Sequence, residues 1–145
     1  MSSTVTKVVR EFCATRPVLG TQEGAFDACL DATKELVREL GEAGFTAETV
    51  RFTEGTRQWP EAHAKWQGLV SRMLPTRSYA WVHYCVLVDD LVIDVTRRQF
   101  DPSADFPHFG TTEEISRDWG RAEVWDMDEG IAVRDVGDPQ APALR

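Results

Sequence analysis

The fold is decided by residues 83–96, which read HYCVLVDDLVIDVT. Two runs rich in β-branched residues flank Asp89-Asp90, and this pattern predicts two strands joined by a tight turn. A two-residue loop and a four-residue loop give the same register there, in which Val88 faces Leu91. We therefore predict an antiparallel hairpin with strands over residues 79–88 and 91–96.

Alternation along this hairpin gathers its polar residues on one face of the sheet. In the register above, His83 and Asp94 are diagonal neighbours, near enough for the carboxylate to hold an imidazole nitrogen. A carboxylate in an apolar strand is costly to bury without a partner, and His83 is the nearest candidate. Cys85 and Thr96 share this face. The opposite face is predicted to be core and carries Val82, Tyr84, Val86, Val88, Leu91, Ile93 and Val95.

Helical spacing appears twice before the hairpin. The apolar residues from Val5 to Cys13 predict a short helix that ends before Pro17. After a loop over residues 17–25, a second helix is predicted from Asp27, as N-cap, to Gly41, as C-cap. Its inward face would consist of Cys29, Ala32, Leu36, Val37 and Leu40.

The remaining patterns complete an α+β fold. They predict strands over residues 45–52 and 121–126 and helices over residues 60–73 and 111–119. The second helix would then pack across an antiparallel sheet of about four strands. We expect a single domain over residues 1–130, followed by a flexible tail over residues 131–145, which is rich in Asp, Gly, Pro and Ala.

Composition limits the partners. The 145-residue chain has a formal net charge of −8 at pH 7, so nucleic acid and anionic membrane surfaces are poor partners. Its three cysteines have no CxxC spacing, which argues against a disulfide scaffold and for a reducing, cytoplasmic location. No apolar run approaches the length of a membrane span, and the oligomeric state stays open.

Cys29, His83 and Asp94 together suit nucleophilic catalysis. A helix N-terminus and a neighbouring imidazolium favour the thiolate of Cys29. His83 would take the thiol proton and return it to the leaving group, and Asp94 would orient the imidazole ring. The oxyanion would bind the backbone N–H of Cys29 and the side-chain amide of Gln22. Trp81 shares the face of His83 and is predicted to border a substrate groove.

Three segments resemble a known superfamily. Phe26-Asp-Ala-Cys-Leu30 resembles the nucleophile helix of papain-like and transglutaminase-like proteins. Residues 83–86 and 92–96 resemble the His-and-Asp hairpin of bacterial transglutaminase-like cysteine hydrolases. The segment Arg98-Gln99-Phe100-Asp101 is similar to the Thr-x-x-Gln-Phe tail of small actinobacterial and phage members. Gln22 is similar in placement to the oxyanion-hole Gln of papain-like enzymes.

The resemblance spans roughly residues 22–109. It implies a papain-like or transglutaminase-like fold, with a helix on a small antiparallel sheet, and a Cys-His-Asp triad acting on an amide or thioester carbonyl without a cofactor. We place Gln99 beside Gln22 and Trp81 among the residues predicted to bind the oxyanion or the substrate. Cys85 stands where family members commonly have a Trp.

The predicted function is a cysteine-dependent hydrolase or acyltransferase acting on a peptide or protein amide, including a Gln side chain. One alternative is a catalytically silent member of the fold that serves as a binding or maturation partner. Another is a redox sensor that uses Cys29 and Cys85. Cys29, Cys85, His83 and Asp94 are ligand types for zinc, but no short-range pair of the usual spacing supports a site, so no metal is predicted.

Overall fold

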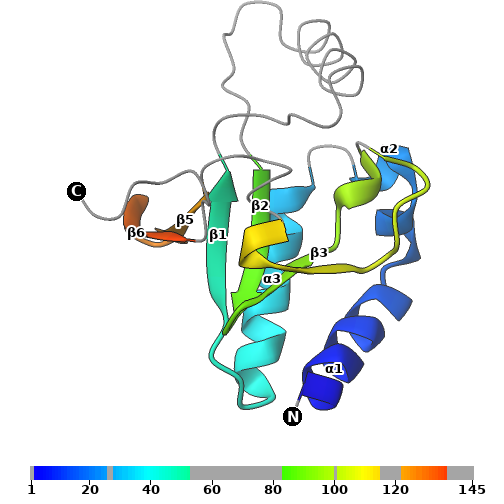
Figure 1. The fold of residues 1–145 in the computed structure, drawn as a ribbon. Coiled ribbons are helices and arrows are strands. Elements are labelled where there is room, and N and C mark those ends of the chain that lie inside the picture. Colours follow the sequence, from blue (N-terminus) through cyan, green and yellow to red (C-terminus); the bar gives the residue numbers. More distant parts are fainter. Residues whose placement is uncertain (1, 26–27, 53–82, 100, 115–121, 137–145) are drawn as a thin grey trace, which may run out of the picture.

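A computed structural model describes residues 2–25, 28–52, 83–99, 101–114 and 122–136 of the chain. The helices are α1 (Ser2–Ala14), η1 (Pro17–Gly20), α2 (Gln22–Ala25), α3 (Cys29–Glu42) and η2 (Arg97–Gln99) (Figure 1). The strands are β1 (Glu48–Phe52), β2 (His83–Val88), β3 (Leu91–Asp94), β4 (His108–Thr111), β5 (Ala122–Asp126) and β6 (Ile131–Val136). Trp81, the helix expected over 60–73 and the start of the strand expected over 79–88 lie outside the described residues.

The strands form one antiparallel sheet in the order β4-β3-β2-β1-β5-β6. The mixed α+β class predicted from the sequence is therefore correct, but the expectation of about four strands is not. The additional strands, β4 and β6, lie at the two edges of the sheet. Their side chains are mostly half-buried or exposed, so they lack the apolar alternation by which a strand is recognised in a sequence.

The tail expected from residue 131 is corrected over its first six residues. Ile131–Val136 pairs with β5 as strand β6, with Asp126 opposite Ile131 and Ala122 opposite Val136. Five of its six side chains are exposed, so backbone pairing rather than side-chain burial holds this strand. Residues 137–145 lie outside the described residues.

The predicted hairpin register is confirmed. Val88 pairs with Leu91, and the ladder continues in the same register to Val86 and Ile93. Asp89 takes a φ of 54° in the connecting turn, a left-handed conformation that Asp tolerates better than most residues. This register determines which hairpin side chains share a face.

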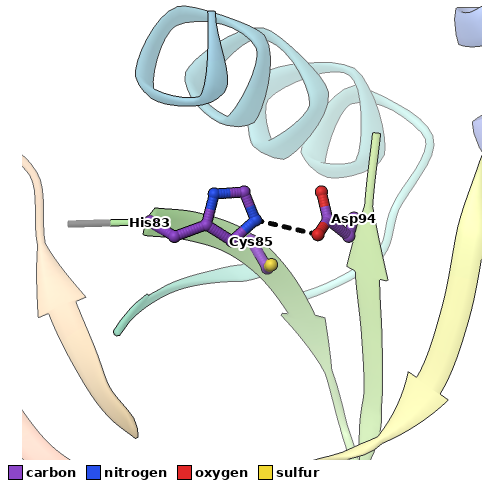
Figure 2. Close-up of side chains that lie close together, drawn as sticks. All are labelled: His83, Cys85 and Asp94. Atoms are coloured by element: carbon purple, nitrogen blue, oxygen red, sulfur yellow. Dashed lines mark hydrogen bonds and ion pairs between the residues drawn. The ribbon is translucent and has the colours of Figure 1, made fainter. Parts of the chain in front are cut away.

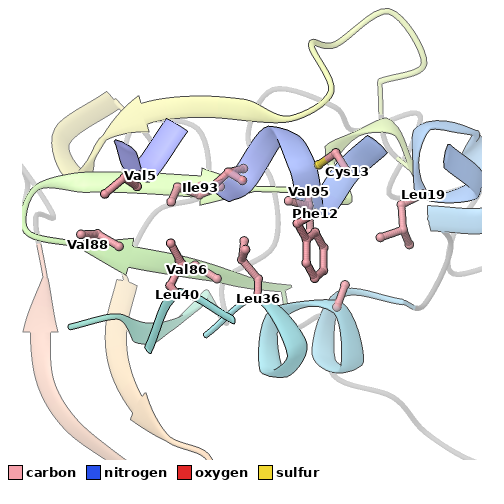
Figure 3. Packing of buried hydrophobic residues seen from close by; sticks show 12 residues of the cluster. Val5, Phe12, Cys13, Leu19, Leu36, Leu40, Val86, Val88, Ile93 and Val95 are labelled. Atoms are coloured by element: carbon pink, nitrogen blue, oxygen red, sulfur yellow. The ribbon is translucent and has the colours of Figure 1, made fainter. Parts of the chain in front are cut away.

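Helices α1 and α3 cover one face of the sheet, α1 lying beside α3 (Figure 1). The face predicted to be core supplies Val86, Val88, Ile93 and Val95, which pack against both helices (Figure 3). The buried face of α3 follows the predicted spacing, with Leu36 and Leu40 fully enclosed. The helix members of this cluster are Val5, Val9, Phe12, Cys13, Leu19, Ala32, Leu36 and Leu40.

The ends of α3 differ from the expected caps. Ala28, not Asp27, occupies the N-cap position, and no side chain caps the first turn. The helix continues through Gly41 to Glu42, and the left-handed residue that ends it is Gly44, with φ of +95°. The amide of Phe45 donates to the carbonyl of Leu40 at 2.9 Å, closing the last turn. Glycine suits this position because it adopts a positive φ without the steric cost that a Cβ atom would add.

The other face of the sheet is also apolar. Phe52, Cys85, Leu87 and Val92 belong to its buried cluster, together with Val50, Ala122 and Val124. Strand alternation places His83 on this face with Cys85, and the ring of Phe52 stacks on the His83 ring with centroids 6.3 Å apart. A histidine here is surrounded by hydrocarbon, so its polar atoms need partners within the protein.

Candidate active site

A buried pair of polar side chains joins β2 to β3. The Nε2 atom of His83 lies 2.8 Å from Oδ2 of Asp94, and the two side chains are 0% and 1% exposed (Figure 2). The diagonal contact predicted from the hairpin register is confirmed. Since Asp94 occupies Nε2, the ring is held in one orientation.

Thr96 holds the other carboxylate oxygen of Asp94. Its backbone N–H donates to Oδ1 at 3.0 Å, and its hydroxyl lies 3.5 Å from the same atom. The side-chain amide of Gln99 donates in turn to the Thr96 hydroxyl oxygen at 3.3 Å. The carboxylate is therefore fixed by Thr96 on one oxygen and by the imidazole on the other.

The electrostatics favour a charged pair. Burial lowers the pKa of His83, but the charges of Asp94 and Cys85 and the hydrogen bonds to Asp94 and Cys29 outweigh it and hold this pKa well above its ordinary value. Burial raises the pKa of Asp94, but attraction to His83, hydrogen bonds from His83 and Thr96, and the charge of Arg97 outweigh it and lower that pKa. The site therefore stabilises His83 as imidazolium beside a carboxylate, the form that the ring takes once it has accepted a proton.

Cys29 is the first residue of α3, and its thiol reaches the His83 ring. The interaction between these two side chains is among the causes that raise the pKa of His83. One turn along the same helix face, the hydroxyl of Thr33 donates to the backbone carbonyl of Tyr84 at 3.4 Å, which fixes the start of α3 against the start of β2. Cys29 is 8% exposed. The three residues predicted from the sequence therefore come together.

Cys85 is a second thiol at the same ring. Its sulfur, a ring nitrogen of His83 and a carboxylate oxygen of Asp94 lie within 4.8 Å of one another (Figure 2). Burial, followed by the charge of Asp94, raises the pKa of Cys85 to about 12, against the opposing effects of His83. Cys85 is accordingly a protonated thiol over the physiological range and a poor nucleophile.

Gln22 and Gln99, both predicted to bind the oxyanion or the substrate, lie together, and each is engaged with the protein. Gln22 begins α2, in a segment expected to be loop, and its side-chain amide donates to the backbone carbonyl of Gln99 at 3.3 Å. Gln99 is 7% exposed and reaches Thr96, as described above. Contact of either residue with an oxyanion or a substrate stays a prediction, and Trp81 lies outside the described residues.

Arg97 is the residue near this site that sequence reasoning missed. It is 7% exposed, and its charge is one of the causes that lower the pKa of Asp94. Arg97 directly follows Thr96 at the end of the hairpin, where the sequence does not show whether an arginine side chain is buried or solvated. The only indication in the sequence was that Arg97 lies close to the strand that carries Asp94.

In comparisons with known proteins, no family model, no curated protein and no solved structure matches this chain. Within the part of the chain that the structure describes, no helix combines the length and the apolar character needed to cross a membrane. What the site does is therefore inferred from its own geometry.

Proposed function

We propose that this protein is a cysteine-dependent hydrolase or acyltransferase of the transglutaminase-like type, acting on a peptide or protein amide. The observation that carries the proposal is that the buried His83 ring is hydrogen-bonded to Asp94 and also interacts with the Cys29 thiol. A thiol at the start of a 14-residue helix, an imidazole and an orienting carboxylate are the parts that acyl transfer to sulfur requires.

The hydrogen bond from Nε2 to Asp94 assigns the roles of the two ring nitrogens. With the Nε2 proton held by the carboxylate, Nδ1 is the nitrogen that accepts the proton of Cys29. The raised pKa of His83 supports an imidazolium next to the sulfur once that proton has moved. The helix N-terminus stabilises the negative charge left on the sulfur.

The reaction then has two halves. The Cys29 sulfur bonds to the carbonyl carbon, the C–N bond breaks, and the departing amine takes the proton from Nδ1 of His83. Water then attacks the thioester, giving its proton to His83, which returns it to the Cys29 sulfur as the acid leaves. An amine in place of water gives transamidation. The backbone N–H of Cys29 is the first donor to the oxyanion, with Gln22 proposed as the second.

A second candidate is a catalytically silent member of this fold that binds a partner. The low exposure of Cys29, 8%, favours it, because a nucleophile must reach its substrate. For either candidate the free, buried thiols at positions 13, 29 and 85 suit a reducing cytoplasm.

An acyl-enzyme assay separates the two candidates. The protein is mixed with p-nitrophenyl acetate, and the acylated residue is identified by mass spectrometry of the digested chain. The enzyme proposal predicts a rapid, stoichiometric burst of nitrophenolate with the acetyl group on Cys29, and a loss of the burst in His83→Ala. Slow acylation spread over the three thiols would instead support the silent fold.

Substrate class is tested on a casein digest. Release of ammonia would show attack on Gln side chains, and new amino termini would show hydrolysis of the main chain. Either product must disappear in Cys29→Ala and persist in Cys13→Ala, which removes another buried thiol remote from His83. Absence of both products from protein that shows the burst would contradict an amide substrate.

A further inference from the structure

The cluster around His83 contains more metal-ligating groups than acyl transfer uses. Cys85 has no role in the proposed mechanism, yet it lies against the catalytic imidazole, where burial forbids solvation of its sulfur. Its side chain, like that of Cys29, forms a hydrogen bond with His83. A thiol at this position therefore needs an explanation of its own.

The donor set matches the preference of zinc. One sulfur, one imidazole nitrogen and one carboxylate oxygen are the ligand types of tetrahedral zinc sites. Bond lengths of about 2.3 Å to sulfur and about 2.0 Å to nitrogen or oxygen place tetrahedral ligands roughly 3.3–3.6 Å apart. The ligand atoms of His83, Cys85 and Asp94 lie within 4.8 Å of one another. Closing on an ion thus requires movements on the order of 1 Å.

The protein around the cluster is built to hold these ligands. Asp94 is oriented by Thr96 on Oδ1, so the oxygen that the ion would bind is Oδ2, which now accepts the hydrogen bond from Nε2 of His83. Cys85 and Asp94 come from neighbouring strands of a confirmed hairpin register, so their backbones are rigidly spaced. The three side chains are at most 1% exposed, which keeps competing water away.

We propose that His83, Cys85 and Asp94 form a site for Zn²⁺ that switches the protein off. When the ion binds, the Cys85 thiol and Nε2 of His83 each give a proton to solvent, Nδ1 keeps a proton, and the Nε2–Oδ2 hydrogen bond is replaced by bonds to the metal. The imidazole then no longer serves Cys29 as a base. The inhibitory consequence rests on the proposed function, whereas the binding of the ion does not.

Binding is measured first on metal-free, full-length protein. Zn²⁺ is titrated against a chromophoric chelator, and Co²⁺ is used as a spectroscopic substitute whose sulfur-to-metal charge-transfer band reports a thiolate ligand. We expect one ion per chain and a charge-transfer band. Removal of a direct ligand in Cys85→Ala should weaken binding by more than about tenfold, since even outer-shell changes cost 10–100-fold.

Cys13→Ala is the matched control. Cys13 is also a buried thiol, but it belongs to the cluster between α1 and the sheet, so its removal should leave zinc affinity unchanged. Equal affinity in Cys85→Ala and wild type would overturn the site. So would a wild-type cobalt complex without the thiolate band, a result that does not depend on whether the variant folds.

Inhibition is measured as the rate at which iodoacetamide alkylates Cys29. Zn²⁺ should slow this rate in wild type and in Cys13→Ala but not in Cys85→Ala. If zinc binds through Cys85 yet leaves the alkylation rate unchanged, the proposed inhibition is contradicted, whereas the proposed zinc site is supported. If Cys29 is unreactive without metal, the proposed function fails independently of the zinc titration.

Discussion

His83 on β2 and Asp94 on β3 form a fully buried, hydrogen-bonded pair with an Nε2–Oδ2 distance of 2.8 Å. Two charged groups removed from water are stable only when each satisfies the other, so the pair is a constraint on the fold as well as a part of the site. Because the pKa of His83 is raised and that of Asp94 is lowered, folding stability depends on pH through both residues.

The first prediction concerns that pH dependence. Stability from His83 is fully present below its unfolded pKa, about 6.5, and is lost as pH rises through the higher folded pKa. Stability from Asp94 is present above about pH 3.9 and is lost as pH falls through its lowered folded pKa. The free energy of unfolding measured in urea should therefore be highest between about pH 4 and 6.5. Just above about pH 6.5 it should fall by an amount approaching about 1.4 kcal/mol per pH unit.

The variant that tests this is Asp94→Asn, which removes the charge that holds the proton on His83. Its unfolding free energy should be lower than that of wild type at pH 6, and the decline between pH 6.5 and 8 should be shallower. His108→Gln, at another histidine, should retain the wild-type slope. An unchanged slope in Asp94→Asn would show that the pair does not titrate as a unit.

The second prediction concerns Thr96. Thr96→Val keeps the shape of the side chain but removes the hydroxyl that accepts from Gln99 and lies beside Asp94. We expect a loss of roughly 1–3 kcal/mol in unfolding free energy, because a buried amide loses its partner. Thr96→Ser, which keeps the hydroxyl, should lose less. Equal losses in the two variants would mean that the methyl group, rather than the hydrogen bonds, stabilises this corner.

The third prediction tests the packing of α3. Leu36 is fully buried between α3 and the sheet, whereas Leu30 on the same helix is 40% exposed. Leu36→Ala should lower the unfolding free energy by about 2–5 kcal/mol, and Leu30→Ala by about 0.5 kcal/mol or less. Similar losses at the two positions would contradict the orientation of the helix that carries Cys29.

The fourth prediction tests the segment that leads to Cys29. A Cβ atom at Gly24, in α2, would run into the backbone carbonyl of Val18, whereas one at Gly41, in α3, meets nothing within 4 Å. Gly24→Ala should therefore destabilise the fold by about 1–3 kcal/mol. Gly41→Ala should stabilise it by up to about 1 kcal/mol. The melting temperatures of the two variants should therefore shift in opposite directions, and a shift in the same direction would contradict the close packing of Gly24 against Val18.

The hairpin and the helices were predictable because their side chains repeat with the period of the element. The alternation from His83 to Thr96 was sufficient to place His83 against Asp94, and that contact is present. Thr111 and Glu114 form a capping box with both of its hydrogen bonds, at the start of the helix expected over residues 111–119.

What the sequence did not reveal depends on contacts that carry no local period. Strand β6 is held by its pairing with β5 while its side chains stay exposed, so no apolar pattern marks it. The inward position of Arg97 follows from tertiary packing. The proposed metal-ligand set does not match a short-range spacing rule, because Asp94 is on β3 while His83 and Cys85 are on β2.

The most direct test of the central claim is the rate at which iodoacetamide alkylates Cys29 at a pH where ordinary free thiols are largely protonated. With metal removed, we predict fast labelling of Cys29 over Cys13 and Cys85, measured by mass spectrometry, and a loss of that preference in His83→Ala. Slow and equal labelling of the three thiols, unchanged by His83→Ala, would contradict the account.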